Sequence, residues 1–339
     1  MTDLYADGLL RAREASVLSV IGNTPLVPLD RMFAEAHFRV FGKLERCNPG
    51  GSVKDRPARA MIERGIAEGR LIPGVSEVVE SSSGNLGIAL AQVCNYYDIG
   101  FHCIVDARAT RTNIALIRAY GGTVEVIDRP DPETGEYLPA RIRRVREICA
   151  ATGAFWPNQY ANAVNAESHH TTIAEILRAL HFRLDYLFCT TSSCGTLRGC
   201  SDFLRSHGLD TVIIGVDAAG SAIFGPQFVG DAVRRLPGHG AAIVPPLFSD
   251  DLVDDVVHVT DAQAVRGCRR LLRTESILCG ASSGAALAAI STYASRIPEG
   301  ALCAAILPDG GDRYLDTVFD DDWVAMNLQD DETDEAVCA

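Results

Sequence analysis

Only two of the 31 Lys and Arg residues are lysines, Lys43 and Lys54, so chemistry that needs a primary amine has two candidates. Lys54 stands between a Gly-rich turn at residues 48–52 and apolar positions at 58, 61, 62 and 66, whose spacing predicts a helix. We expect Ser52 to cap this helix. The positive end of a helix dipole disfavours the ammonium form of a nearby lysine, and a neutral amine can form a Schiff base or act as a base. We therefore predict that Lys54 is a reactive amine and not a surface lysine, whereas Lys43, inside an apolar strand, is structural.

Two further loops join a strand to a helix and are rich in Ser, Thr, Asn and Gly. They lie at residues 81–87, before a helix predicted over 88–97, and at residues 191–196, before a helix predicted over 197–207. Free backbone N–H groups at a helix N-terminus bind anions such as carboxylate and phosphate. The alternative for each loop is a well-capped helix without a ligand.

These loops require a regular scaffold, and the apolar segments provide one. Strands are predicted at 38–45, 77–80, 101–106, 123–128, 186–190, 212–217 and 303–307, with helices between them that include 142–150 and 165–180. Such alternation is typical of a parallel α/β protein. A dinucleotide-binding fold is not favoured, because the first strand is not followed by Gly-x-Gly-x-x-Gly.

Composition narrows the class further. A 36.4 kDa chain with 47% hydrophobic residues can bury a large core, which we expect to form two lobes. The net charge of −13 argues against nucleic-acid and anionic-membrane partners. Eleven cysteines without a Cys-x-x-Cys pair indicate buried thiols in a reducing cytoplasm, with neither a metal site nor a disulfide framework.

Three motifs in the same order along the chain resemble one known family. They are Ile-Gly-Asn-Thr-Pro-Leu at 21–26, Asn-Pro-Gly-Gly-Ser-Val-Lys-Asp-Arg at 48–56 and Pro-Asp-Gly-Gly-Asp-Arg-Tyr at 308–314. They are similar to motifs of the cysteine synthase/cystathionine β-synthase family of pyridoxal-phosphate enzymes, fold type II. The resemblance implies a two-lobed, tryptophan synthase β-like α/β fold, in which each lobe is a mostly parallel sheet flanked by helices, and a homodimer.

The same resemblance implies the domain boundaries. Residues 1–46 and 161–325 would form the large cofactor-binding lobe, and residues 47–160 a small mobile lobe. Residues 326–339 are acidic and poor in apolar residues, so we expect a disordered tail.

The resemblance also implies roles for individual residues. Lys54 would hold pyridoxal 5'-phosphate and act as the general base, and Asn85 would bind the phenolic oxygen of the cofactor. Ser282, with Ser283 as the fallback, would bind the pyridine nitrogen. The cofactor phosphate would bind the loop of Ser192, Ser193, Cys194, Gly195 and Thr196, in which Ser192 and Cys194 replace the usual glycines. The substrate would contact Ser82, Ser83, Gly84, Arg141, Tyr160 and Ser193.

A hydroxyl at the pyridine nitrogen makes the ring a weaker electron sink than a carboxylate would, which suits β-elimination and replacement through an aminoacrylate intermediate. The loop departures resemble the siderophore-pathway branch that joins O-phospho-L-serine to L-glutamate on the way to 2,3-diaminopropionate. Both substrates are anionic, so an arginine such as Arg141 would offset their charge; the alternative for Arg141 is a solvated helix face.

Other activities remain alternatives. A cysteine synthase that uses O-acetyl- or O-phospho-L-serine and sulfide would carry the same cofactor residues. We do not expect a threonine dehydratase or a cystathionine β-synthase, since neither a haem segment nor a regulatory domain is predicted. A catalytically idle scaffold protein is not favoured, because Lys54, Asn85 and Ser282 are all present.

Overall fold

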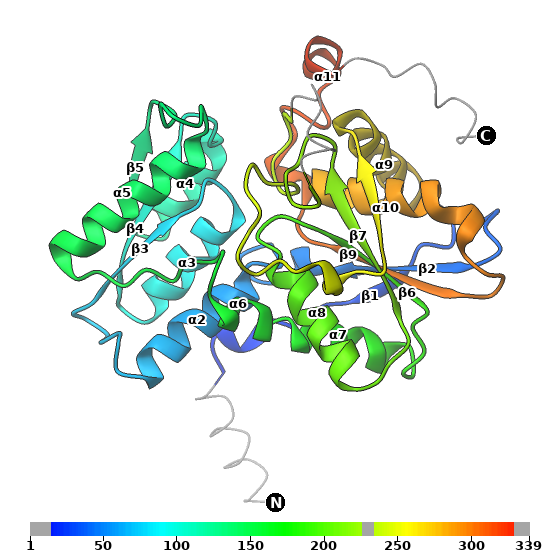
Figure 1. The fold of residues 1–339 in the computed structure, drawn as a ribbon, viewed down its shortest axis with the longest axis horizontal. Coiled ribbons are helices and arrows are strands. Elements are labelled where there is room, and N and C mark those ends of the chain that lie inside the picture. Colours follow the sequence, from blue (N-terminus) through cyan, green and yellow to red (C-terminus); the bar gives the residue numbers. More distant parts are fainter. Residues whose placement is uncertain (1–14, 226–233, 329–339) are drawn as a thin grey trace, which may run out of the picture.

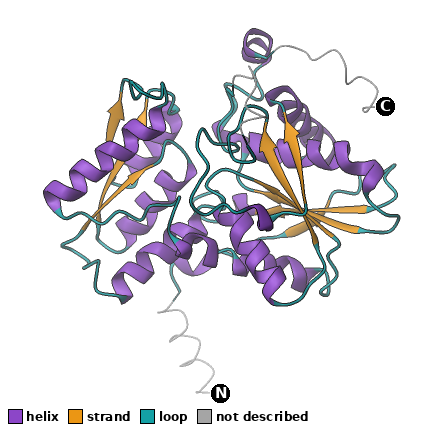
Figure 2. Cartoon of the chain, in the orientation of Figure 1, coloured by secondary structure: helices purple, strands orange, loops and turns teal. Residues whose placement is uncertain are grey.

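The computed structural model describes residues 15–225 and 234–328 of the chain. Two α/β units lie side by side, each with a central sheet covered by helices (Figure 1). Helices cover both faces of each sheet, and loops connect the two units (Figure 2). The architecture confirms the predicted α/β class with parallel sheets.

The smaller unit holds a three-stranded parallel sheet in the order β3 (Glu77–Ser81), β4 (Gly100–Asp106) and β5 (Thr123–Ile127). Successive side chains of a strand point to opposite faces, and both faces are buried here. Val78 packs with helices α2 (Asp55–Ala67), α3 (Asn85–Tyr96) and α4 (Arg111–Ala119), whereas Val79 packs with α5 (Tyr137–Thr152). This packing places the loops after β3 and β4 at one end of the sheet.

The larger unit holds a six-stranded sheet. Its order is β1 (Leu26–Pro28), β2 (Arg39–Leu44), β9 (Leu302–Leu307), β6 (Tyr186–Thr190), β7 (Val212–Ala218) and β8 (Asp255–Val259). Only the β1–β2 pair is antiparallel. One core cluster joins this sheet to α7 (His170–Ala179) and α8 (Gly195–Ser206), and another joins it to α9 (Asp261–Glu275) and α10 (Ala281–Tyr293).

Glycines permit the close contact of α9 with α10. A Cβ built on Gly267 would lie 2.2 Å from the carbonyl oxygen of Gly284, so any larger residue there would push the helices apart. Helix α10 is buried along most of its length between the sheet and α9, which explains why its sequence is free of charged residues and rich in alanine.

Three local predictions need correction. The predicted helix 165–180 is two helices, α6 (Ala163–Glu167) and α7, because the break brings the fully buried His169 ring to Thr172 and Thr196. Helix α5 begins five residues earlier than predicted and includes Pro139 in its first turn. A proline is tolerated there, because the N–H that it lacks would have no intrahelical acceptor. Lys54, not Ser52, is the N-cap of α2, because Ser52 pairs in a β-bridge with Asp309.

The last described helix is α11 (Asp321–Asn327), so the first two residues of the predicted tail are helical, and residues 329–339 lie outside the described part. All three strands of the smaller sheet fall within residues 47–160, but the predicted boundaries and mobility of the small lobe stay predictions. Among the described helices, none is long and apolar enough to cross a membrane.

Candidate active site

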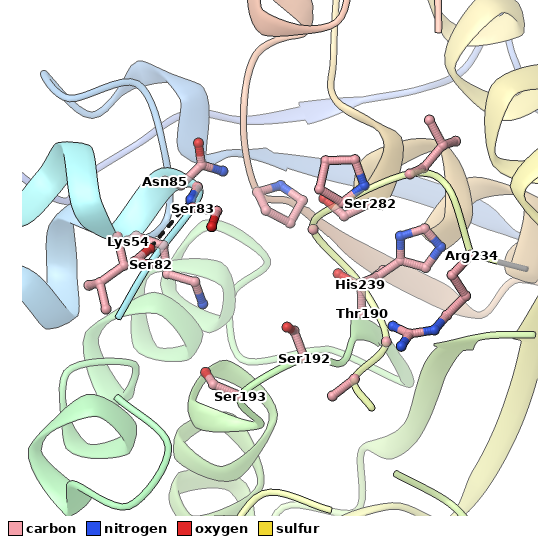
Figure 3. Close-up of a pocket in the computed structure, with 18 of the residues that line it drawn as sticks. Lys54, Ser82, Ser83, Asn85, Thr190, Ser192, Ser193, Arg234, His239 and Ser282 are labelled. Carbon is pink, nitrogen blue, oxygen red and sulfur yellow. Dashed lines mark hydrogen bonds between the residues drawn. The ribbon is translucent and has the colours of Figure 1, made fainter. Parts of the chain in front are cut away.

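A cavity of about 520 Å³ is lined by residues of both units. Lys54 and the Ser82–Asn85 loop lie on one side, and Ser192, Ser193 and Ser282 lie on the other (Figure 3). The structure brings all the predicted site residues to this one cavity. They are Lys54, Ser82, Ser83, Gly84, Asn85, Arg141, Tyr160, Ser192, Ser193, Cys194, Gly195, Thr196 and Ser282. Ser283, the fallback for Ser282, is fully buried and does not line the cavity.

The two lysines have different surroundings. Lys43 is fully buried and donates to the Thr24 carbonyl at 2.5 Å and to the Glu175 carboxylate at 2.6 Å, which confirms its structural role. Lys54 lines the cavity at the start of α2. Burial lowers the pKa of Lys54, and Cys189, Cys194 and Asp309 oppose this shift only in part. The Lys54 amine is thus the one available for chemistry in the cavity.

The loop before α8 leaves the start of the helix without a side-chain cap. Cys194 has a left-handed backbone with φ of 63°, and its side chain makes no hydrogen bond that caps the helix. The Cys194 side chain instead packs in a hydrophobic cluster with Ile223, Ala241 and Leu247. The N–H groups of the first turn of a helix have no intrahelical acceptor. They therefore remain free for a phosphate.

A glycine is required within this loop. A Cβ on Gly195 would lie 2.3 Å from the Asn165 side chain, which itself donates to the Gln159 carbonyl at 2.7 Å. Asn165 also reaches the Ser193 hydroxyl at 3.5 Å. The loop is consequently held against the segment that returns from the smaller unit.

Hydrogen bonds within the loop before α3, to β4 and to the segment after β9 hold this loop in place. The Ser82 hydroxyl accepts from the Gly87 N–H at 3.0 Å, and the Ser83 hydroxyl donates to the Asp106 carboxylate at 3.2 Å. Asn85, the first residue of α3, donates to Asp309 at 2.8 Å.

The Arg141 side chain, from helix α5, points toward this loop and not into solvent. Its Nη1 donates to the Ser83 hydroxyl at 2.8 Å, its Nε lies 3.3 Å from the Asp106 carboxylate, and its side chain is 11% exposed. The solvated helix face suits Arg143 instead, whose side chain is 56% exposed. The alternative that Arg141 lies on a solvated face is therefore wrong.

Tyr160 lies at the end of a partly buried segment, residues 154–160, between α5 and α6. Burial raises the pKa of Tyr160, and its carbonyl accepts from the Leu247 N–H at 3.2 Å. Close by, the buried Glu80 carboxylate accepts from the Trp156 indole at 3.0 Å and from the Gln159 N–H at 3.2 Å. Burial, only partly offset by these bonds, raises the pKa of Glu80 to about 7.

Sequence reasoning missed several residues of the site. Asp106 is the last residue of β4 and lines the cavity, and Asp309 lies two residues after β9 and accepts from Asn85 beside the cavity. Both stand at the edge at which ligands bind in α/β sheets, and this position was an available signal. Arg108 and Arg234 also line the cavity, but nothing in their local sequence distinguishes them from other arginines. Within the described ranges, no group of three His, Cys, Asp or Glu side chains could hold a metal ion.

Comparison with known proteins finds close relatives. A family model described as pyridoxal-phosphate dependent enzyme matches residues 17–309. The N-(2-amino-2-carboxyethyl)-L-glutamate synthase of Ralstonia nicotianae is 46% identical over 312 residues, 91% of each chain. The protein of the same name from Cupriavidus metallidurans is 45% identical over 315 residues, again 91% of each.

Solved structures agree. An O-ureido-L-serine synthase is 34% identical with a TM-score of 0.82, covering 91% of this chain and 98% of that one. An O-acetylserine dependent cystathionine β-synthase from Helicobacter pylori is 28% identical with a TM-score of 0.81, covering 89% and 97%.

Proposed function

The chain belongs to the family of pyridoxal-phosphate dependent enzymes, and from that premise we propose that it joins O-phospho-L-serine to the amino group of L-glutamate. The products would be N-(1-amino-1-carboxy-2-ethyl)-L-glutamate and phosphate. The observation that carries the proposal is the hydrogen bond from Arg141 to the Ser83 hydroxyl, in the cavity that Lys54 also lines. The names of the two relatives at 45–46% identity support it, since they describe this product class.

The residues of the cavity fit pyridoxal phosphate. Lys54 offers a primary amine of lowered pKa for its aldehyde, and the uncapped start of α8 at residues 192–196 offers N–H groups for its phosphate. Ser282 and Asn85 would hold the ring nitrogen and the phenolic oxygen. When bound, the cofactor withdraws electrons from the α-carbon of an amino acid.

Lys54 would be the general base. Because burial lowers its pKa, the Lys54 amine loses its proton at a lower pH than an ordinary lysine does. The neutral amine can take the α-proton of the donor serine and later return it to the product. The Ser82–Gly84 loop at the start of α3 would hold the α-carboxylate of the donor, which fixes the α-carbon next to Lys54.

Positive charge near the cavity suits anionic substrates. The chain carries a net charge of −13, yet Arg108 and Arg141 line the cavity from the smaller unit and Arg234 from the larger one. Among the described residues, Arg141 has Asp106 as its ion-pair partner, whereas Arg108 stacks over the Tyr137 ring at 5.1 Å without a carboxylate partner. We assign the donor phosphate to Arg141 and Ser193, beside Tyr160, and the glutamate side chain to Arg108.

Several features of the setting belong to the same proposal. The product would serve 2,3-diaminopropionate and siderophore biosynthesis in the cytoplasm, and the enzyme would work as a homodimer. The small lobe, residues 47–160, would move on substrate binding.

The test is phosphate release from O-phospho-L-serine by the purified holoenzyme, with L-glutamate, with sulfide and with neither. We expect release that depends on glutamate, together with a product of the summed mass. K54A is the control for release without catalysis. Release driven by sulfide would instead identify a cysteine synthase, and turnover of O-acetyl-L-serine alone would show that the leaving group is acetate.

A further inference from the structure

Three side chains from the two units form a partly buried polar network beside the cavity. Asn85, at the start of α3, donates from Nδ2 to Asp309 Oδ2 at 2.8 Å and accepts at Oδ1 from Arg313. Asp309 and Arg313 both follow β9, more than 200 residues further along the chain. The Tyr314 hydroxyl also donates to Asp309 Oδ2, at 2.7 Å. The network thus holds one amide of the smaller unit from the larger unit.

The chemistry of the two partners admits only one orientation of the amide. An ionised carboxylate can only accept hydrogen bonds, and a guanidinium can only donate them. If the Asn85 amide turned by 180°, its oxygen would face Asp309 and its NH₂ group would face Arg313, so both contacts would be repulsive. In the observed orientation, one hydrogen of Nδ2 is donated to Asp309, and the second can be donated to a ligand in the cavity.

We propose that Asp309 and Arg313 are positioning residues that fix the Asn85 amide as a hydrogen-bond donor toward the phenolic oxygen of the cofactor. This inference rests on the proposed contact of Asn85 with pyridoxal phosphate. A donor at this oxygen stabilises its negative charge, which alters the absorption of the bound cofactor. An acceptor at the same place would destabilise that charge.

Asp309 is a buried carboxylate, and burial of a charged group is unfavourable. The carboxylate is 2% exposed, and its Oδ1 has no hydrogen-bond partner in the described part of the chain. Burial raises the pKa of Asp309, whereas the bonds from Asn85 and Tyr314 and the charge of Arg313 lower it. A Cβ on Gly280 would lie 2.0 Å from Oδ1, so this glycine is needed to admit the carboxylate.

Arg313 extends the network to the segment that carries the reactive lysine. Its Nη2 donates to the Gly50 carbonyl at 2.7 Å, four residues before Lys54. The same guanidinium therefore links the Lys54 turn and the Asn85 helix to the larger unit. Arg313 thus contacts both segments of the smaller unit that carry a predicted cofactor contact.

The variants D309N and R313Q test the proposal, since an amide at either position can both donate and accept and so removes one of the two constraints on the orientation of Asn85. Spectra of the bound cofactor and its affinity for the apoprotein are the readouts. We expect both variants to change the ratio of the visible to the near-ultraviolet band in the same direction as N85A. We also expect at least about a tenfold loss of affinity, equivalent to about 1.4 kcal/mol.

Matched controls lie in the same loops. D312N removes a carboxylate three residues from Asp309 whose one ion-pair partner among the described residues is Arg46. R46Q removes that partner, which contacts the Leu278 carbonyl and not Asn85. Both should keep the wild-type spectrum and affinity. If D309N does not fold, R313Q carries the test, because the Arg313 side chain is only partly buried.

The outcomes separate the two levels of the inference. If N85A changes the spectrum while D309N and R313Q do not, the positioning role is wrong and the cofactor contact stands. If N85A also leaves the spectrum and affinity unchanged, the proposed contact of Asn85 is wrong, and the positioning role falls with it. Equal effects of D312N and D309N would likewise overturn the inference, since they would show a general effect of charge.

Discussion

Arg141 offers a way to separate structural from functional roles within one charge pair. The variant R141Q removes the guanidinium that lies 3.3 Å from Asp106 and 2.8 Å from the Ser83 hydroxyl. Since the Arg141 and Asp106 side chains are 11% and 8% exposed, the substitution leaves a nearly buried carboxylate without its ion-pair partner. The double variant R141Q/D106N removes that carboxylate charge as well.

The two variants should differ in stability but not in activity. Loss of one partner of a buried pair lowers the free energy of unfolding by about 3–5 kcal/mol. The double variant should regain most of this loss, because no unpaired charge remains. Loss of a charge-assisted hydrogen bond of about 1.5–3 kcal/mol corresponds to a fall in kcat/KM of about 10- to 150-fold, which we expect for both variants.

Urea unfolding and phosphate release from O-phospho-L-serine with L-glutamate measure the two quantities. R144Q is the matched control, because Arg144 lies on the same helix, pairs with Glu125 and does not line the cavity. Recovery of both stability and kcat/KM in R141Q/D106N would refute the reasoning. It would mean that Arg141 serves only to neutralise Asp106.

Three further predictions concern the surroundings of the site. K54A should lose covalently retained cofactor and slow turnover by about 10²–10⁴-fold with the fold intact, whereas an active K54A protein would exclude Lys54 as the base. Burial raises the pKa of Asp55 to about 7, above its unfolded value, so this group stabilises the fold at low pH and the contribution is lost as pH rises through 7. Between pH 5 and pH 8, the free energy of unfolding of wild type should fall by about 2.5 kcal/mol relative to D55N, and an equal pH dependence in urea would contradict this. A Cβ on Gly199 would lie 1.9 Å from the Ala166 carbonyl oxygen, so G199A should lower the free energy of unfolding by about 3 kcal/mol. An unchanged urea midpoint would show that α6 and α8 can move apart to admit the methyl group.

Much of the fold was predictable because its signals are local. Apolar segments with turns between them predicted the parallel strands, and the strands observed at β2, β4, β6 and β7 start within a residue or so of the predicted bounds. The breaks that were missed have tertiary causes. The interruption between α6 and α7 depends on His169, whose ring contacts Thr196 of another helix.

The sequence by itself determined which residues could do the chemistry. The scarcity of lysine, the Gly-rich turn before Lys54 and the Ser- and Gly-rich loops before α3 and α8 are local features, since backbone conformation and free N–H groups depend on neighbouring residues. Those features were enough to point to Lys54 and to the two loops that line the cavity.

The tertiary structure alone decided how these residues are partnered. Ser83 and Arg141 are 58 residues apart, and Asn85 and Asp309 are 224 apart. Burial and charge pairing depend on distances in space that no local pattern encodes, so neither the pairing of Arg141 with Asp106 nor the Asp309–Asn85–Arg313 network could be read from the chain. Residue type thus sets the available chemistry, and packing sets the protonation and orientation of the groups that would perform it.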